Sequence, residues 1–521
     1  MSGRTGGHQE VETKFDVDST FVLPPLTRLD GIASAAGPTE ERLDAVYYDT
    51  DDLLLARNLI TLRRREGGHD AGWHLKLPSD QPGRVEITRP LAAVERDEAP
   101  GGGGNVVPGQ FADIVTATTR GRPLREVARI RTVRQAVILR DADGRELAEL
   151  ADDEVHAQTL GAATTLSRWR EIEVEALGDD HDVLAATSAA LVAAGARPAH
   201  GPSKLARALG ERATRPELPD AGALLAAGAT AGQVVQGYLS TNAAALLAAD
   251  ARVRLGEPES VHDLRVAARR LRSVLRTFDA FFEPPAAAGL QERLRTLNLL
   301  LNPVRDGEVQ LARFSAAIRS LDPRDVLGPV AARIQGRLGS QELRGREQAL
   351  EWLRGAEYAG LLEDLMAFVR EPPFSALGRE ADRRTLLRPV CKADRKLRRR
   401  VERAMAAAVG PDQDAALHSA RKAAKQLRYA SEAVTPACGP EAAKHARRAK
   451  KIQNILGEHQ DCVVAQTTLR DFGIAANLAG ESSFSYGLLL GEEREKARLT
   501  RETFAARWPR LSRRRHRRWL R

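Results

Sequence analysis

One stretch of the chain places a histidine and three cationic side chains at a spacing that a single helix face can hold. They stand at offsets of 0, 3, 7 and 10 residues: His262, Arg265, Arg269 and Arg272. At about 100° per residue these positions share an arc of roughly 80° on an α-helix. The opposite face would carry Leu264, Ala267, Leu271 and Val274. The stretch therefore predicts an amphipathic helix with an apolar back and a narrow cationic stripe.

The pattern returns 156 residues further on, in His418, Arg421, Lys425 and Arg428. A second match, offset by 155 residues, relates residues 300–306 to residues 455–461. Two copies of about 150 residues predict a pseudo-symmetric helical domain made by duplication, because this period is far too long for a solenoid.

Neither stripe contains an acidic residue. Basic helix faces are often simply solvated, but a solvated face usually mixes signs, and like charges at these spacings repel each other. We therefore expect both stripes to bind an anion. Nucleic acid would suit the charge, but aromatic residues make up only 4% of the chain and none lies in a stripe. The histidines lack the partners of a metal site, so a phosphate-binding role that is sensitive to pH near neutrality fits better.

The first part of the chain alternates charged and apolar residues, as β-strands do. Acidic positions share strand faces at Glu10 and Glu12, with Lys14, and again at Glu171, Glu173 and Glu175. Paired cations stand at Arg63 and Arg65. Such a sheet could expose its charged face to solvent, which is the usual case for antiparallel sheets. It could equally form a closed barrel with a charged lumen, in which cations hold phosphate oxygens and carboxylates hold a divalent metal.

Charge divides the chain in two. Residues 1–210 carry 25 basic and 33 acidic residues, whereas residues 211–521 carry 54 and 37, so different chemistry is expected in each part. We expect domains at 1–210 and 229–510, a Pro- and Gly-containing linker at 211–228, and a basic tail at 511–521 that only solubilises the chain. Three scattered cysteines, with no signal peptide and no long apolar run, predict a cytoplasmic protein that does not enter a membrane.

A series of motifs in the first part resembles the CYTH superfamily, which includes triphosphate tunnel metalloenzymes. The series runs in order through Glu10-x-Glu12-x-Lys14, 47–51, 62–65, Lys76, 84–86, 131–134, Asp152-Asp153, 171–175 and Ser203-Lys204. The resemblance covers residues 8 to about 210. It implies an antiparallel β-barrel that forms a tunnel, and hydrolysis of a triphosphate with Mg²⁺ or Mn²⁺.

The same resemblance implies roles for single residues. Phosphates would be held by Lys14, Arg63, Arg65, Lys76, Arg134 and Lys204. Metal binding and orientation of the attacking water would fall to Glu10, Glu12, Asp153, Glu171 and Glu173. Asp152 and Asp153 compete for one role, and the run from Glu171 to Glu175 permits a register error of two residues.

The second part resembles the CHAD domain, from about residue 230 to 510, because His262 and His418 are each followed by the cationic stripe. This resemblance implies binding of inorganic polyphosphate in a basic channel between two helical repeats, and association with polyphosphate granules.

We therefore predict an α+β multidomain protein that joins a metal-dependent triphosphatase barrel to a polyphosphate-binding helical bundle. A non-enzymatic polyphosphate-binding protein is the first alternative. The CYTH superfamily also includes adenylyl cyclases. A cyclase or a nucleic-acid binder is therefore a further, less favoured alternative.

Overall fold

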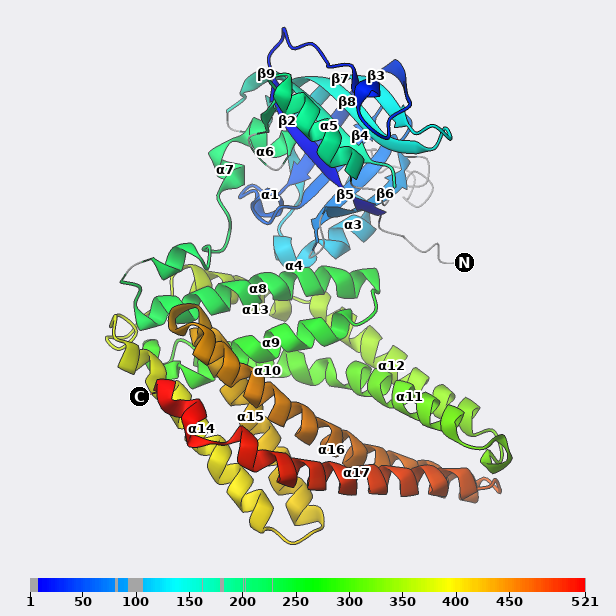
Figure 1. The fold of residues 1–521 in the computed structure, drawn as a ribbon, viewed down its shortest axis with the longest axis vertical. Coiled ribbons are helices and arrows are strands. Elements are labelled where there is room, and N and C mark those ends of the chain that lie inside the picture. Colours follow the sequence, from blue (N-terminus) through cyan, green and yellow to red (C-terminus); the bar gives the residue numbers. More distant parts are fainter. Residues whose placement is uncertain are drawn as a thin grey trace. The chain divides into compact units, whose positions relative to one another are not determined.

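A computed structural model describes residues 8–520, except 80–82, 92–105, 162, 179–181, 200, 202 and 227, and gives no side-chain description for 8–10. The chain forms two compact units, Met1–Glu217 and Leu218–Arg521 (Figure 1). The division lies within the stretch 211–228 that the sequence analysis assigns to a linker. However, the first unit continues past residue 210, because the buried Glu217 carboxylate accepts hydrogen bonds from Arg120 and Asn58.

The first unit is built on one antiparallel sheet of ten strands, in the order β1-β6-β5-β4-β3-β7-β8-β9-β2-β10. Their bounds are β1 His8–Glu10, β2 Glu12–Val17, β3 Ser34–Asp49, β4 Thr61–Glu66, β5 Gly72–Pro78, β6 Arg84–Pro90, β7 Arg125–Arg140, β8 Glu146–Thr159, β9 Leu166–Ala176 and β10 Arg197–Pro198. Only Val11 separates β1, which pairs with β6, from β2, which pairs with β9. The segment 8–17 thus joins both sides of the sheet. The predicted antiparallel tunnel fold is confirmed. However, β1 and β6 pair through only three residue pairs, so the sheet is not closed along its full length.

The outer face of several strands is apolar and covered by helix α5 (Asp182–Ala193) (Figure 1). Phe15, Ile172 and Val174 pack there with Val183 and Leu191 of the helix. Successive strand residues point to opposite faces. The neighbours of these apolar residues, which include Lys14, Glu171 and Glu173, therefore point to the inner face.

An apolar cluster fills the inner face beside those charges and includes Val155, Trp169 and Leu205. Leu205 belongs to the short helix α6 (Lys204–Leu209). The Ser203 hydroxyl caps this helix by accepting a hydrogen bond of 3.1 Å from the backbone N–H of Ala206. The cap and the buried Leu205 together fix the position of Lys204.

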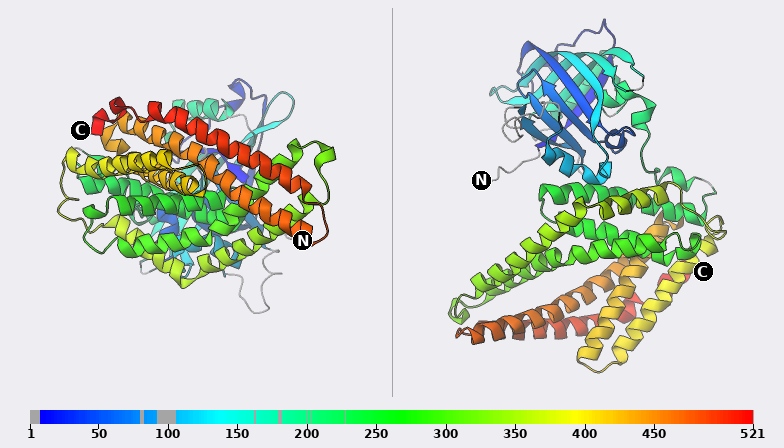
Figure 2. Two further views of the ribbon diagram at one scale, coloured as in Figure 1. Left: turned by 90° about the horizontal axis from the view of Figure 1, so that it is seen from below. Right: turned by 180° about the vertical axis from the view of Figure 1, so that it is seen from behind.

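The regular elements among the described residues of the second unit are helices, apart from the isolated β-bridge between Phe282 and Phe374, which confirms the predicted all-α part. Its longer helices are α8 Ala231–Leu255, α9 Ser260–Thr277, α10 Ala288–Leu300, α11 Asn302–Ser320, α12 Val330–Arg354, α13 Ala356–Arg370, α14 Arg383–Ala406, α15 Pro411–Cys438, α16 Pro440–Leu478 and α17 Phe484–Leu511. Helices α11 and α12 form one long hairpin, and α16 and α17 form another (Figures 1 and 2). None of the helices in the described residues is long and apolar enough to cross a membrane.

The two sequence repeats differ in continuity. Residues 455–461 lie inside the unbroken α16, whereas the matching residues 300–306 are divided between α10 and α11. Pro303 stands in the first turn of α11. Proline has no N–H to donate and is tolerated at a helix start, so it ends one helix and begins the next.

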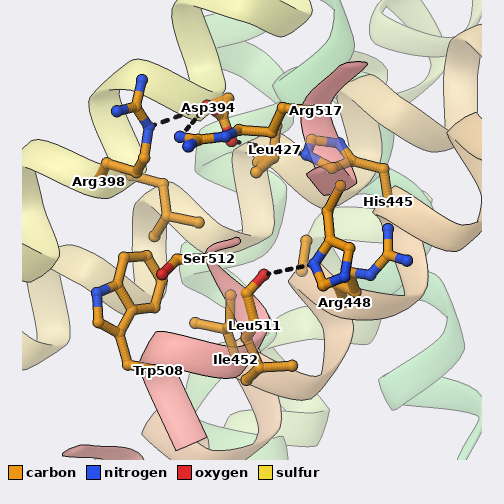
Figure 3. Close-up of a pocket in the computed structure, with 13 residues that line it drawn as sticks. Asp394, Arg398, Leu427, His445, Arg448, Ile452, Trp508, Leu511, Ser512 and Arg517 are labelled. Carbon is orange, nitrogen blue, oxygen red and sulfur yellow. Dashed lines mark hydrogen bonds and ion pairs between the residues drawn. The ribbon is translucent and has the colours of Figure 1, made fainter. Parts of the chain in front are cut away.

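The C-terminal segment packs onto the helical unit, in contrast to the expected solubilising tail. The short helix η5 (Arg514–Leu520) contacts α14 and α16. Two arginines pair with the Asp394 carboxylate (Figure 3). Arg517 of this segment lies 3.6 Å from it, and Arg398 of α14 lies 3.1 Å from it. The Trp519 ring lies edge-on against His445, with ring centroids 5.4 Å apart. An aromatic anchor within the basic run thus holds the segment in place.

Candidate functional site

Three carboxylates meet on the inner face of the first unit. Asp153 on β8 stands opposite Glu171 on β9, and Glu173 follows on the same face of β9. One oxygen from each lies within 4.8 Å of the others. Asp153 and Glu171 are buried, and Glu173 is nearly so. Carboxylate oxygens are the ligands that Mg²⁺ and Mn²⁺ prefer, so these residues fit a divalent cation.

The same carboxylates are held by three cations. Lys204 Nζ lies 2.9 Å from Asp153, 2.7 Å from Glu171 and 2.7 Å from Glu173. Arg134 on β7 donates two hydrogen bonds of 2.8 Å to Asp153 and one of 2.9 Å to Glu173. Lys14 on β2 pairs with Glu173 and, at 3.0 Å, with Glu12. The cations predicted to hold phosphate thus interlock with the carboxylates predicted to hold metal.

Glu173 and Lys204, at the centre of this network, are both charged at neutral pH. Burial raises the pKa of a carboxyl group, but Lys14, Lys204 and Arg134 outweigh that effect and hold the pKa of Glu173 well below its ordinary range. Burial lowers the pKa of Lys204, but Asp153, Glu173 and Glu171 outweigh it and keep its pKa well above the ordinary value. Opposite charges therefore stabilise each other in an interior that would reject either sign alone.

A second charged group lies on β3 to β6. Arg63 donates to the Tyr47 hydroxyl at 3.3 Å, and Lys76 lies 3.8 Å from Glu86. Burial raises the pKa of Tyr47, but Arg63, Lys204 and Lys76 outweigh it and lower the pKa. Cations of both charged groups, Lys204 of the first and Arg63 and Lys76 of the second, thus act on the Tyr47 hydroxyl. Tyr47 belongs to the motif at 47–51, but the sequence analysis assigned it no role. In the order of the motifs it stands between cations predicted to hold phosphate, and this was the signal available.

Near Arg63 lie His74, which was not predicted to act, and Arg65, which was predicted to hold phosphate. His74 Nδ1 lies 2.9 Å from Glu86, and His74 is almost fully buried. Burial and the nearby Arg63 lower the pKa of His74 to about 4, so the ring is neutral and orients Glu86. Arg65 is bound to Asp70, and burial lowers its pKa to about 10.

The structure places the residues that the sequence left ambiguous. Asp152 points to the opposite face from Asp153 and receives hydrogen bonds of 2.8 and 2.7 Å from Arg170. Glu175 pairs across the strands with Glu12 and lies outside the carboxylate group of Asp153, Glu171 and Glu173. The side chain of Glu10 lies outside the described residues, and its backbone pairs with Arg84.

In the second unit the two cationic stripes converge, because helices α9 and α15 pack together. Arg269 of the first stripe donates to Tyr429 on α15 at 3.1 Å. Each repeat also provides one aspartate at matching distance: Arg265 lies 4.0 Å from Asp306, and Arg421 lies 4.0 Å from Asp461. These contacts extend the duplication from the sequence to the side chains.

The inner members of the stripes form what we call the central cation cluster: Arg265, Arg269, Arg421 and Lys425. Burial, followed by Arg421, Arg269 and Arg265, lowers the pKa of Lys425 to about 7. Among the residues that the structure describes, Nε of Arg265, Nε of Arg421 and Nδ1 of His418 are buried and find no hydrogen-bond partner. A buried donor without a partner costs about 1–3 kcal/mol, so an anion that reached these groups would relieve that cost.

The outer members of the stripes differ from one another. Arg428 is held by Glu432 at 2.6 Å, whereas Arg272 faces Arg276 and Arg295. Burial, then cationic neighbours, lowers the pKa of both His262 and His418. Both histidines are therefore neutral at pH 7 before any anion binds.

Comparisons with known proteins match these two units in order. The family model for the CYTH domain matches residues 8–197, and that for the CHAD domain matches residues 237–470. Two uncharacterized proteins of Mycobacterium tuberculosis, from strains CDC 1551 and H37Rv, are each 37% identical over 523 residues, with 96% of both chains covered.

Solved structures with similar folds cover parts of the chain. PptA from Streptomyces chartreusis has a TM-score of 0.45 at 23% identity, covering 54% of this chain and 99% of its own. The CHAD domain from the plant Ricinus communis has a TM-score of 0.39 at 23% identity, covering 56% and 91%. HpAC1 from Hippeastrum, a putative adenylyl cyclase described as having a dominant triphosphatase activity, has a TM-score of 0.21 at 16% identity, covering 38% and 93%.

Proposed function

The chain belongs to the proteins that join a CYTH domain to a CHAD domain, and from this we propose that it is a divalent-metal-dependent triphosphatase whose helical unit binds inorganic polyphosphate. The observation that carries the first half is the interlocked network of three carboxylates and three cations inside the sheet. A metal–triphosphate complex presents both signs of charge, and this network supplies the complement of each.

Asp153, Glu171 and Glu173 are the residues that would hold the metal. When bound, such an ion polarises a phosphoryl oxygen and lowers the pKa of a bound water. Lys204 would then lose its carboxylate partners to that ion. Its ammonium group, with Lys14 and Arg134, would be free to turn to phosphate oxygens, which form strong charge-assisted hydrogen bonds. Arg63 and Lys76, with Tyr47 beside them, supply further donors on the facing strands.

The central cation cluster supports the second half of the proposal. Within this cluster, Arg265, Arg421 and Lys425 carry like charge and are not fully paired with acidic groups. Such an arrangement favours a ligand with closely spaced negative charges. A linear polyphosphate meets this need because several of its phosphates can engage the cluster at once. Base stacking would need aromatic side chains, and Tyr429 is already held by Arg269.

The test is product analysis with purified full-length protein. Tripolyphosphate, ATP and long-chain polyphosphate are each incubated with Mg²⁺ or Mn²⁺, and then with a chelator. We expect orthophosphate from tripolyphosphate, with loss of activity on chelation. Binding without any product would favour the non-enzymatic alternative, and cyclic AMP with pyrophosphate from ATP would favour the cyclase.

A further inference from the structure

Lys425 is set apart from the other cations of the two stripes by what surrounds it. Within the described part of the chain, its Nζ has no hydrogen-bond or ion-pair partner, and the side chain is partly buried. Lys422, three residues earlier on the same helix, is exposed. The two lysines thus share a helix and a charge but differ in environment.

Cations face Lys425 from two helices. Arg421 belongs to its own helix α15, and Arg265 and Arg269 come from α9. His418, also on α15, is near enough for Lys425 to lower its pKa. The Asp461 carboxylate of α16 also acts on Lys425 and raises its pKa. The same carboxylate lies 4.0 Å from the Arg421 guanidinium.

Polar groups of α14 and α8, which also pack against α15, are bonded to residues other than Lys425. Lys396 of α14 is bonded to Gln426 at 3.0 Å, and Tyr238 of α8 is bonded to Glu432 at 3.1 Å. Lys425 therefore stands in a partly buried position where positive neighbours outnumber negative ones. Burial, first, and then Arg421, Arg269 and Arg265 lower its pKa to about 7.

We propose that Lys425 takes up a proton when the helical unit binds polyphosphate. The inference rests on the polyphosphate binding proposed above. Phosphate oxygens would add negative charge beside Lys425, where the chain places only the Asp461 carboxylate that Arg421 also contacts among its described residues. The ammonium form would then become favourable, as it is for an ordinary lysine.

Proton uptake predicts a pH dependence with a definite sign. At pH 8 only about a tenth of the free protein would carry the proton on Lys425, so binding would take up nearly one proton. At pH 6 the free protein is already protonated there and Lys425 would take up almost none. Affinity should therefore fall as pH rises from 7, by up to about tenfold per pH unit.

The experiment is calorimetric titration of the full-length protein with long-chain polyphosphate at pH 8, in two buffers of different ionisation enthalpy. The difference in heat gives the protons taken up. We expect close to one for the wild type and for the control Lys422→Arg. Lys425→Arg keeps the charge but cannot release its proton, so it should bind with uptake reduced by about that amount. Long chains keep the contribution of their terminal phosphates small.

The outcomes separate this inference from the function on which it rests. Failure of the wild type to bind polyphosphate would overturn the proposed function. Binding with equal heats in the two buffers would leave that function standing and overturn the role of Lys425. Uptake that persists in Lys425→Arg but disappears when His262 and His418 are replaced by Gln would assign the proton to the histidines and overturn it too.

Discussion

Removal of the central cation cluster should weaken polyphosphate binding in a way that salt reveals. The variant replaces Arg265, Arg269, Arg421 and Lys425 with Ala. Each cation that neutralises one phosphate of a flexible strand adds about 0.7 to the slope of log affinity against log salt. Loss of four should lower that slope by about 3. At about 0.1 M salt the affinity would fall roughly 1,000-fold, or about 4 kcal/mol.

The helices should survive these four substitutions. Leu264 and Leu271 on the opposite face of α9 are fully buried and unchanged. Mutual repulsion in the cluster is also removed, so the melting temperature should not fall. Binding would be measured by fluorescence anisotropy of labelled polyphosphate across a salt series at pH 6, where Lys425 is charged.

A charge-matched control comes from the exposed face of α14. Replacing Arg384, Arg388, Lys392 and Arg395 with Ala removes the same number of charges from exposed positions. We expect this control to keep most of the slope and affinity. An equal loss in both variants would show that binding is a property of net charge, and an unchanged slope in the cluster variant would refute the placement of the ligand.

Three further outcomes follow from packing and charge. A fragment of residues 1–210 should be less stable to denaturant than one of residues 1–217, by about 3–5 kcal/mol, because it removes Glu217 from the buried Arg120; equal midpoints would show that this pair is not formed. Lys425→Met should raise the melting temperature of the unliganded protein more at pH 6 than at pH 9, because the folded state binds the Lys425 proton more weakly than the unfolded state and its charge is costly only while it is held; the reverse trend would contradict the environment described. Trp519→Ala should lower the melting temperature by a few degrees, since it removes the ring that packs on His445, whereas no change would return the segment to the role of a solubilising tail.

Periodicity predicted much of this molecule because it reports which face of an element is apolar. Leu264 and Leu271 lie on the buried face of α9 as expected, with the cations opposite. The alternation of Ile172 and Val174 with Glu171 and Glu173 likewise separates the outer from the inner face of β9.

Periodicity was insufficient where both faces of an element carry charge or where a contact joins distant segments. β8 has acids on both faces, so Asp152 and Asp153 could be separated only by the Arg170 that bonds one of them. The contact of Lys204 with three carboxylates depends on how α6 packs against Val155 and Trp169. Lys425 was placed in the right stripe, but its exposure to Arg265 and Arg269 depends on the packing of α9 on α15.

The most direct test of the central claim compares two adjacent residues of one strand. Phosphate release from tripolyphosphate with Mg²⁺ is measured for the wild type, Asp153→Asn and Asp152→Asn, with circular dichroism to verify folding. Asp153 lies among the proposed metal ligands, whereas Asp152 is bound to Arg170 on the opposite face. We predict that Asp153→Asn loses at least about 100-fold in turnover, or close to 3 kcal/mol of barrier, while Asp152→Asn stays within a few-fold of the wild type. A folded Asp153→Asn protein with wild-type turnover, or equal losses in both variants, would contradict the proposed site.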